Sequence, residues 1–236
     1  MRGADLWSIS DAYSSNNESV DNNYIVITTH RSYTIALDAL LETLAAWPKE
    51  RIIIVYSGEP SNTTEIRNRM TVVKITNNIY EYGGFFVPLL LDIPDGTFLL
   101  LHDTCKAGPN FAKKAERYFE DFKESSTDVL WFSRTGQCNL CMFNHKVSTA
   151  AYGKWSAWST LDKTKAINME HDLGHPDGLK SDTTLSQVFV DCNQQTQGPV
   201  TPYVNNAVRE ALYFPCIDIV KYYFVIHADG VHPQRP

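Results

Sequence analysis

Residues 97–111, TFLLLHDTCKAGPNF, decide the fold expected for this 236-residue chain. The apolar run at residues 98–101 lies between an Asp-Gly pair and a Gly-Pro pair, and it stops at His102 and Asp103. A short apolar run bounded by turn residues is typical of a strand that is buried on both faces of a parallel sheet. Ligands of open α/β sheets bind at the carboxyl ends of such strands. The sequence therefore predicts a ligand site around the polar residues that follow this strand.

Strand and helix patterns alternate along the rest of the chain. The other expected strands cover residues 24–29, 51–56, 71–76, 128–133, 188–190 and 219–226. The expected helices cover residues 32–47 with Ser32 as the N-cap, 80–91, a segment that begins at Pro109, 147–155 and 161–172. A polar, flexible link is expected between the second and third strands. This order predicts an α/β fold with a mostly parallel central sheet flanked by helices.

Residues 1–23 are rich in Ser, Asn and Asp, which is typical of a flexible leader. Residues 24–236 have the length of a single domain. The net charge of −6 argues against a protein that coats nucleic acid. No apolar run approaches the roughly 18 residues of a membrane span. The N-terminus lacks the apolar segment of a signal peptide. We therefore expect a cytoplasmic protein with no integral membrane span.

The chain has five cysteines: Cys105, Cys138, Cys141, Cys192 and Cys216. In the absence of a secretory signal we expect free, buried thiols rather than disulfides. Cys138 and Cys141, with His145 four residues further on, resemble half of a zinc site, but a structural zinc ion needs four ligands. On the same reasoning the two glycosylation sequons, Asn17-Glu18-Ser19 and Asn62-Thr63-Thr64, are accidental.

Asp103 follows a buried strand, where an unpaired charge has a high free-energy cost. One interpretation is that its carboxylate holds a divalent cation that bridges the two phosphates of a nucleoside diphosphate. Mg²⁺ and Mn²⁺ suit this site because such metals use one or two carboxylates together with phosphate oxygens. The alternative is a carboxylate that caps the following turn. His227 and His232, after the last strand, are either further site residues or solvated tail residues.

Two other groups of polar residues are candidates for the site. Glu170 and Asp172 end the segment NMEHD, where a carboxylate could be the general base for an acceptor hydroxyl, or simply part of a solvated helix terminus. The second group follows the first and second strands and either borders a base and ribose or forms ordinary turns. Its members are Thr28, Thr29, His30, Arg31, Ser57 and Glu59.

Several motifs, taken in order, resemble a GT-A-type glycosyltransferase that uses nucleotide sugars. They are YIVITTHRS, IIIVYSGEPSNTT, FLLLHDTCKAG, RTGQCNLCM, and YGKW followed by NMEHD. The resemblance covers residues 24–175, and the C-terminal strand with His227 extends it. It implies a Rossmann-like nucleotide half and an acceptor-side half within one domain, and transfer of a sugar from a UDP- or GDP-sugar to a hydroxyl of a glycan or glycoconjugate.

The resemblance also implies roles for individual residues. Asp103, with His102 beside it, stands where the family carries the Asp-x-Asp motif that holds the diphosphate and its Mn²⁺ or Mg²⁺. His227 would be the distant metal ligand, and Glu170 or Asp172 the base. Ser57 and Glu59 would border the nucleoside.

Two alternatives stay open. A sugar-nucleotidyltransferase acts on related ligands, but its Gly-rich phosphate loop is missing after the first strand, and the chain has no Walker or Gly-x-Gly-x-x-Gly pattern. A non-catalytic module that binds nucleotide sugars or glycans with the same fold is the other alternative. It gains support because His102-Asp103-Thr104 lacks the first Asp of Asp-x-Asp.

Overall fold

A computed structural model describes residues 22–31, 33–133, 140–157, 178–197 and 208–224. Its larger sheet has eight strands in the order β3-β4-β2-β1-β5-β8-β7-β9. From one edge to the other these strands are Thr63–Arg67, Met70–Ile75, Ile52–Ser57, Asn23–Thr29, Thr97–His102, Cys141–Phe143, Val129–Trp131 and Gln187–Phe189. The four strands β4, β2, β1 and β5 are parallel neighbours. The expected α/β class with a mostly parallel central sheet flanked by helices is thus confirmed.

The two central strands form because their sequences are continuous apolar runs. Every residue of β1 and β5 is buried, and Ile25 pairs with Leu99 in the parallel register. Burial on both faces removes the polar alternation that a half-exposed strand would show. This is why the sequence identified these strands correctly.

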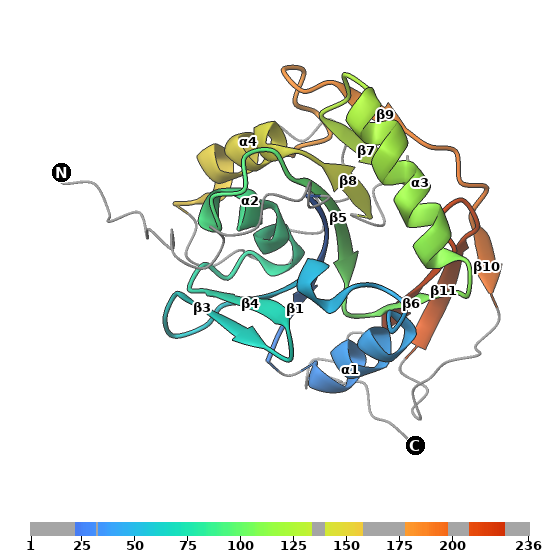
Figure 1. Ribbon diagram of the computed structural model, residues 1–236, viewed down its shortest axis with the longest axis horizontal. Helices are drawn as coiled ribbons and strands as arrows, with labels where there is room; N and C mark the ends of the chain where they lie inside the picture. Colours follow the sequence, from blue (N-terminus) through green and yellow to red (C-terminus); the bar gives the residue numbers. More distant parts are fainter. Residues whose placement is uncertain (1–21, 32, 134–139, 158–177, 198–207, 225–236) are drawn as a thin grey trace.

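Helices cover both faces of the larger sheet (Figure 1). On one face, α1 (Thr34–Thr43) and α3 (Phe111–Glu124) pack against Ile25, Ile27, Leu99 and Leu101. On the other face, the 3₁₀ helix η2 (Tyr80–Phe86), α2 (Val87–Leu90) and α4 (His145–Trp155) pack against Val26, Phe98 and Leu100. A short 3₁₀ turn, η1 (Lys49–Arg51), leads into β2. Alternate residues of each central strand therefore contribute to two separate cores.

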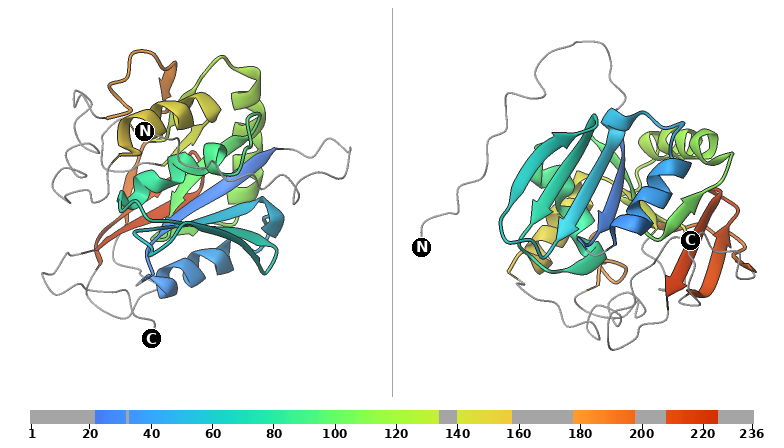
Figure 2. Two further views of the ribbon diagram at one scale, coloured as in Figure 1. Left: turned by 90° about the vertical axis from the view of Figure 1, so that its left-hand side faces the viewer. Right: turned by 90° about the horizontal axis from the view of Figure 1, so that it is seen from below.

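A second, smaller sheet lies beside α1 and α3 (Figure 2). Its four strands are antiparallel and run in the order β10-β11-β12-β6: Gln195–Gln197, Val208–Phe214, Ile219–Phe224 and Cys105–Ala107. The chain leaves β5 at His102 and enters β6 at Cys105. At this point only two residues, Asp103 and Thr104, connect the larger sheet to the smaller one. The sequence predicted β12 but not the sheet to which it belongs.

Several expected boundaries were wrong. Residues 63–67 form the edge strand β3 rather than a flexible link. The segment expected as one helix over 80–91 is split into η2 and α2. Helix α1 ends at Thr43, with Tyr33 rather than Ser32 at its N-cap, although Trp47 beyond it is still buried. The helix expected over residues 161–172 lies outside the described residues, as does most of the expected leader.

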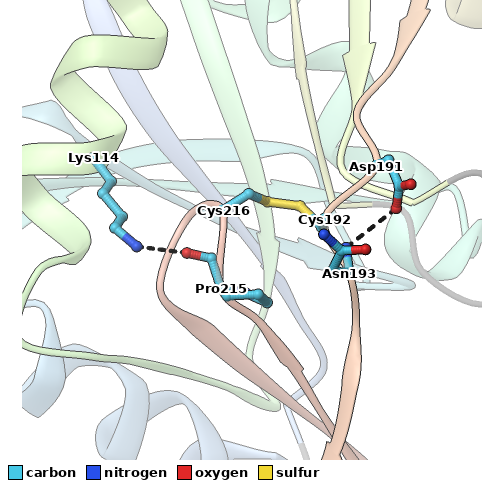
Figure 3. Close-up of a disulfide and its surroundings, with 6 residues drawn as sticks. All are labelled: Lys114, Asp191, Cys192, Asn193, Pro215 and Cys216. Atoms are coloured by element: carbon cyan, nitrogen blue, oxygen red, sulfur yellow. Dashed lines mark hydrogen bonds between the residues drawn. A yellow bond between two sulfur atoms is a disulfide. The ribbon is translucent and has the colours of Figure 1, made fainter.

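The expectation of free thiols was also wrong in part. Cys192 and Cys216 form a disulfide with their Cα atoms 5.1 Å apart (Figure 3). It joins the segment between β9 and β10 to the turn between β11 and β12, where Lys114 of α3 donates a hydrogen bond to the carbonyl of Pro215. Cys105 and Cys141 are buried and take no part in this disulfide. Cys138 lies outside the described residues, so the half zinc site stays untested.

No helix among the described residues is long and apolar enough to cross a bilayer.

Gly84 allows η2 to pack closely on the central strands. A Cβ atom at this position would collide with Leu100 Cδ1 and lie 2.7 Å from Thr28 Cγ2. We expect Gly84→Ala to lower the free energy of unfolding by about 1–3 kcal/mol, the usual cost of an overpacked core. Urea unfolding measures the change. Gly153→Ala in α4 is the matched control, because its Cβ would meet nothing within 4 Å, and it should stabilise the fold by up to about 1 kcal/mol. Equal effects of the two variants would contradict the packing argument.

Candidate functional site

The path of the chain places the candidate site between β1 and β5. From β1 the chain runs to β2 and β4 on one side, and it then crosses to β5 on the other side of β1. The strand order therefore reverses at β1. Such a switch point, at the carboxyl ends of parallel strands, is where open α/β sheets bind ligands. Thr28, Thr29, His102 and Asp103 lie there.

Asp103 is held at this point by the two neighbouring strands. Its backbone N–H donates to the Thr28 carbonyl at 3.1 Å, and its Oδ2 atom accepts a hydrogen bond from Thr29 Oγ1 at 2.8 Å. The residue is 8% exposed. Burial raises the pKa of Asp103 to about 6, while the Thr29 hydrogen bond and the charge of Lys221 act in the opposite direction. Asp103 is therefore a mainly ionised carboxylate at neutral pH that stays close to its titration range.

His102 belongs to the opposite face of the sheet. It pairs in register with Thr28, whose Oγ1 donates to the Leu101 carbonyl at 3.3 Å. Burial, with the charge of Lys221, holds the pKa of His102 well below its usual value, so the imidazole is neutral. Its Nε2 atom is buried and has no hydrogen-bond partner among the described residues. His102 and Asp103 thus differ in charge state and in the face to which they belong.

Lys221 of β12 is a site residue that sequence reasoning missed. Its Nζ atom donates to Thr104 Oγ1 at 2.6 Å, and the side chain is buried although it carries a charge. Lys221 pairs with Cys105 across the smaller sheet, and the Tyr222 N–H donates to the Thr104 carbonyl at 3.0 Å. The cation therefore stands next to the Asp103-Thr104 connection. The available signal was a single lysine in the apolar and aromatic run IVKYYF.

Tyr56 of β2 was also missed. It pairs in register with Thr29, and it is partly buried on the face that carries α1 and α3. Burial raises the pKa of Tyr56, the charge of Arg67 opposes this, and the carboxylates of Asp38, Glu59 and Asp103 add to the rise. The phenol therefore stays neutral and can donate a hydrogen bond near Asp103.

The other residues predicted near the first two strands lie at or just after the carboxyl ends of β1 and β2. Ser57 ends β2 and lies on the η2 face, where it sits close to Gly83. The Oε1 atom of Glu59 is buried and has no hydrogen-bond partner among the described residues. The His30 ring lies 6.2 Å from the ring of Tyr33, and Arg31 is exposed. The structure thus brings Thr29 directly to Asp103.

The proposed metal ligands and the base are only partly described. Glu170, Asp172, His227 and His232 lie outside the described residues. Within the described ranges, no group of three or more His, Cys, Asp or Glu side chains is placed to hold a metal ion. The carboxylate of Asp103 suits Mg²⁺ or Mn²⁺, which bind through one or two carboxylates and phosphate oxygens. By strand alternation, His102 belongs to the other face of the sheet.

Lys221 should help to keep Asp103 ionised. In Lys221→Met we expect the pKa of Asp103 to rise further, because the opposing cation is lost while the burial and the charge of Glu81 remain. NMR titration of the Asp103 carboxyl carbon measures the shift. Lys221→Arg, which keeps the charge, is the control and should leave the titration close to that of the parent protein. An unchanged titration in Lys221→Met would place the ammonium too far away to act on the carboxylate.

No family model matches this chain, and a search of curated proteins finds none with significant similarity.

Proposed function

We propose that this protein is a glycosyltransferase that moves a sugar from a nucleoside diphosphate sugar to a hydroxyl of a glycan or glycoconjugate. The observation that supports it most is the buried, ionisable Asp103 at the switch point between β1 and β5. A carboxylate with a raised pKa in such a place is a candidate for function, because burial and neighbouring charges shift pKa values most often at functional sites. The motif resemblance supports the choice of ligand.

In this proposal the site acts by stabilising the leaving diphosphate. A divalent cation, Mn²⁺ or Mg²⁺, would neutralise the phosphate charge when bound, and Asp103 would hold it, with His227 as the second protein ligand. Lys221 adds a positive charge beside Thr104. Preorganised charges directed at a leaving group commonly make the largest contribution to catalysis.

The other predicted residues complete the proposal. Thr28, His30 and Arg31 from the end of β1, with Ser57 and Glu59 from the end of β2, would border the base and ribose. Neutral His102 would border the ligand from the face of the sheet that carries η2. Glu170 or Asp172 would remove the proton of the acceptor hydroxyl, a step worth roughly 10²–10⁴-fold in rate.

The test is a panel of UDP- and GDP-sugars, each incubated with the protein and Mn²⁺, with Mg²⁺, or with a chelator. Release of a nucleoside diphosphate supports the glycosyltransferase. Release of pyrophosphate from a sugar phosphate and a nucleoside triphosphate would show a nucleotidyltransferase instead. Binding of a nucleotide sugar without turnover would leave a binding module. Loss of activity with the chelator, and its return with either metal, supports the metal assignment.

A further inference from the structure

The disulfide between Cys192 and Cys216 changes the meaning of the two sequons. Disulfides form and persist in oxidising compartments, whereas cytosolic thiols are kept reduced. The sequons are expected to be accidental if the protein stays in a reducing compartment, which the missing secretory signal led us to expect. With two cysteines joined across the segment between β9 and β10 and the β11–β12 turn, that premise no longer holds. Asn-x-Ser/Thr is the acceptor sequence for N-linked glycans in secreted proteins.

The sequon Asn62-Thr63-Thr64 lies where a glycan can attach. Asn62 is exposed and directly precedes β3, the outermost strand of the larger sheet. Its Oδ1 atom accepts a hydrogen bond from the Thr76 N–H at 2.7 Å. This bond occupies the amide oxygen and orients the side chain. The Nδ2 atom, to which N-linked sugars are joined, remains available at the surface.

We infer that Asn62 carries an N-linked glycan, added in an oxidising secretory compartment. The Nδ2 atom attacks the anomeric carbon of an oligosaccharide that is linked to a lipid pyrophosphate. A C–N bond forms, the C–O bond to the pyrophosphate breaks, the amide loses a proton, and the lipid pyrophosphate leaves. This modification does not depend on the proposed transferase activity.

The position of Asn62 also gives the glycan a physical effect. Strand β3 pairs only with β4 among the described strands, so its other side is an exposed sheet edge, and Ile66 on it is 63% exposed. Exposed edge strands with apolar side chains promote pairing between molecules. A glycan at the start of β3 shields this edge. Strands β4, β2 and β1 lie between β3 and Asp103, although Asn62 is at the same carboxyl edge of the sheet as Glu59.

The experiment is peptide mapping, without reduction, of the protein isolated from the cells that naturally produce it. After treatment with peptide N-glycosidase in heavy-oxygen water, we expect labelled Asp at position 62. In the same digest we expect the peptides of Cys192 and Cys216 to be linked. An unmodified Asn62 in protein with linked cysteines would overturn the inference. Free thiols at Cys192 and Cys216 would overturn it as well.

Secreted variants of the full chain show whether the sequon itself is responsible. All carry Asn17→Gln, which removes the other acceptor. Thr64→Ala should abolish the gel shift produced by the glycosidase, whereas Thr64→Ser should retain it. Asn62→Asp should abolish the shift while keeping an oxygen acceptor for the Thr76 N–H. A glycosidase-sensitive shift in Thr64→Ala or Asn62→Asp would contradict the assignment to Asn62.

Discussion

Asp103→Asn should remove catalytic turnover and at the same time stabilise the fold. The variant keeps an oxygen that can accept the Thr29 hydrogen bond, but it loses the charge that would hold the cation and diphosphate. Loss of one group that stabilises a transition-state charge commonly lowers kcat by about 10²–10³-fold. We therefore expect nucleoside diphosphate release to fall by at least about this factor. Near-normal turnover would remove Asp103 from the site.

The stability gain follows from the raised pKa. The pKa of Asp103 is about 6 in the folded protein against an ordinary value of 3.8, so the folded state binds the proton more tightly than the unfolded chain. Stability from this group is therefore greatest at low pH and falls as pH rises from about 4 to about 6. A difference of about 2 pKa units corresponds to about 3 kcal/mol. Asp103→Asn should thus be more stable than the parent by up to about 3 kcal/mol above pH 6, and the gain should vanish near pH 4.

Urea unfolding at several pH values measures this difference, and a donor-hydrolysis assay on the same samples measures activity. Asp95→Asn is the matched control, because Asp95 is exposed and lies just before the opposite end of the same strand. It should change neither activity nor the pH dependence. A loss of stability in Asp103→Asn that is independent of pH would assign the carboxylate a structural role.

The second large effect concerns the disulfide. Replacing Cys192 and Cys216 by alanine removes a cross-link between residues 24 apart in the sequence. In the chain-entropy model a loop of this size contributes about 3 kcal/mol. For a chain of this length that corresponds to a fall in Tm of about 6–12 °C. Scanning calorimetry without reductant measures the change.

Reductant provides the control for this prediction. It should lower the Tm of the parent protein towards that of the double variant and leave the Tm of the variant unchanged. Cys141→Ala is a further control, because it changes a buried cysteine of β8 outside this disulfide and should respond to reductant as the parent does. A parent Tm that is insensitive to reductant would show that the cross-link adds no stability.

The parts of the fold that the sequence predicted are those with a strong local signal. Strands β1, β2 and β5 are runs of buried apolar residues, and Asn144, which accepts hydrogen bonds from the N–H groups of Lys146 and Val147, begins α4 close to the expected position. Strand β3 was missed because TTEIR is polar and mostly exposed, and only its pairing with β4 makes it a strand. The smaller sheet was missed because its strands come from distant parts of the chain.

The candidate site also contains some residues that the sequence could predict and others that it could not. Thr29 and Asp103 could be predicted because Thr29 ends one buried strand and Asp103 directly follows another, and parallel strands bring their carboxyl ends together. Lys221 could not, because it lies 117 residues from its partner Thr104. The disulfide was missed for a different reason. Cys192 and Cys216 are brought together by the fold of the smaller sheet, and the sequence spacing of the two residues gives no sign of this.

The two residues that join the sheets have a consequence for control of the protein. Asp103 and Thr104 connect β5 in the layer formed by the larger sheet to β6 in the layer formed by the smaller sheet. Lys221 of the smaller sheet donates a hydrogen bond to Thr104. Any relative displacement of the layers therefore changes the distance between the cation and the carboxylate. A change in that distance would in turn change the pKa of Asp103, because the charge of Lys221 is one of the causes that lower it.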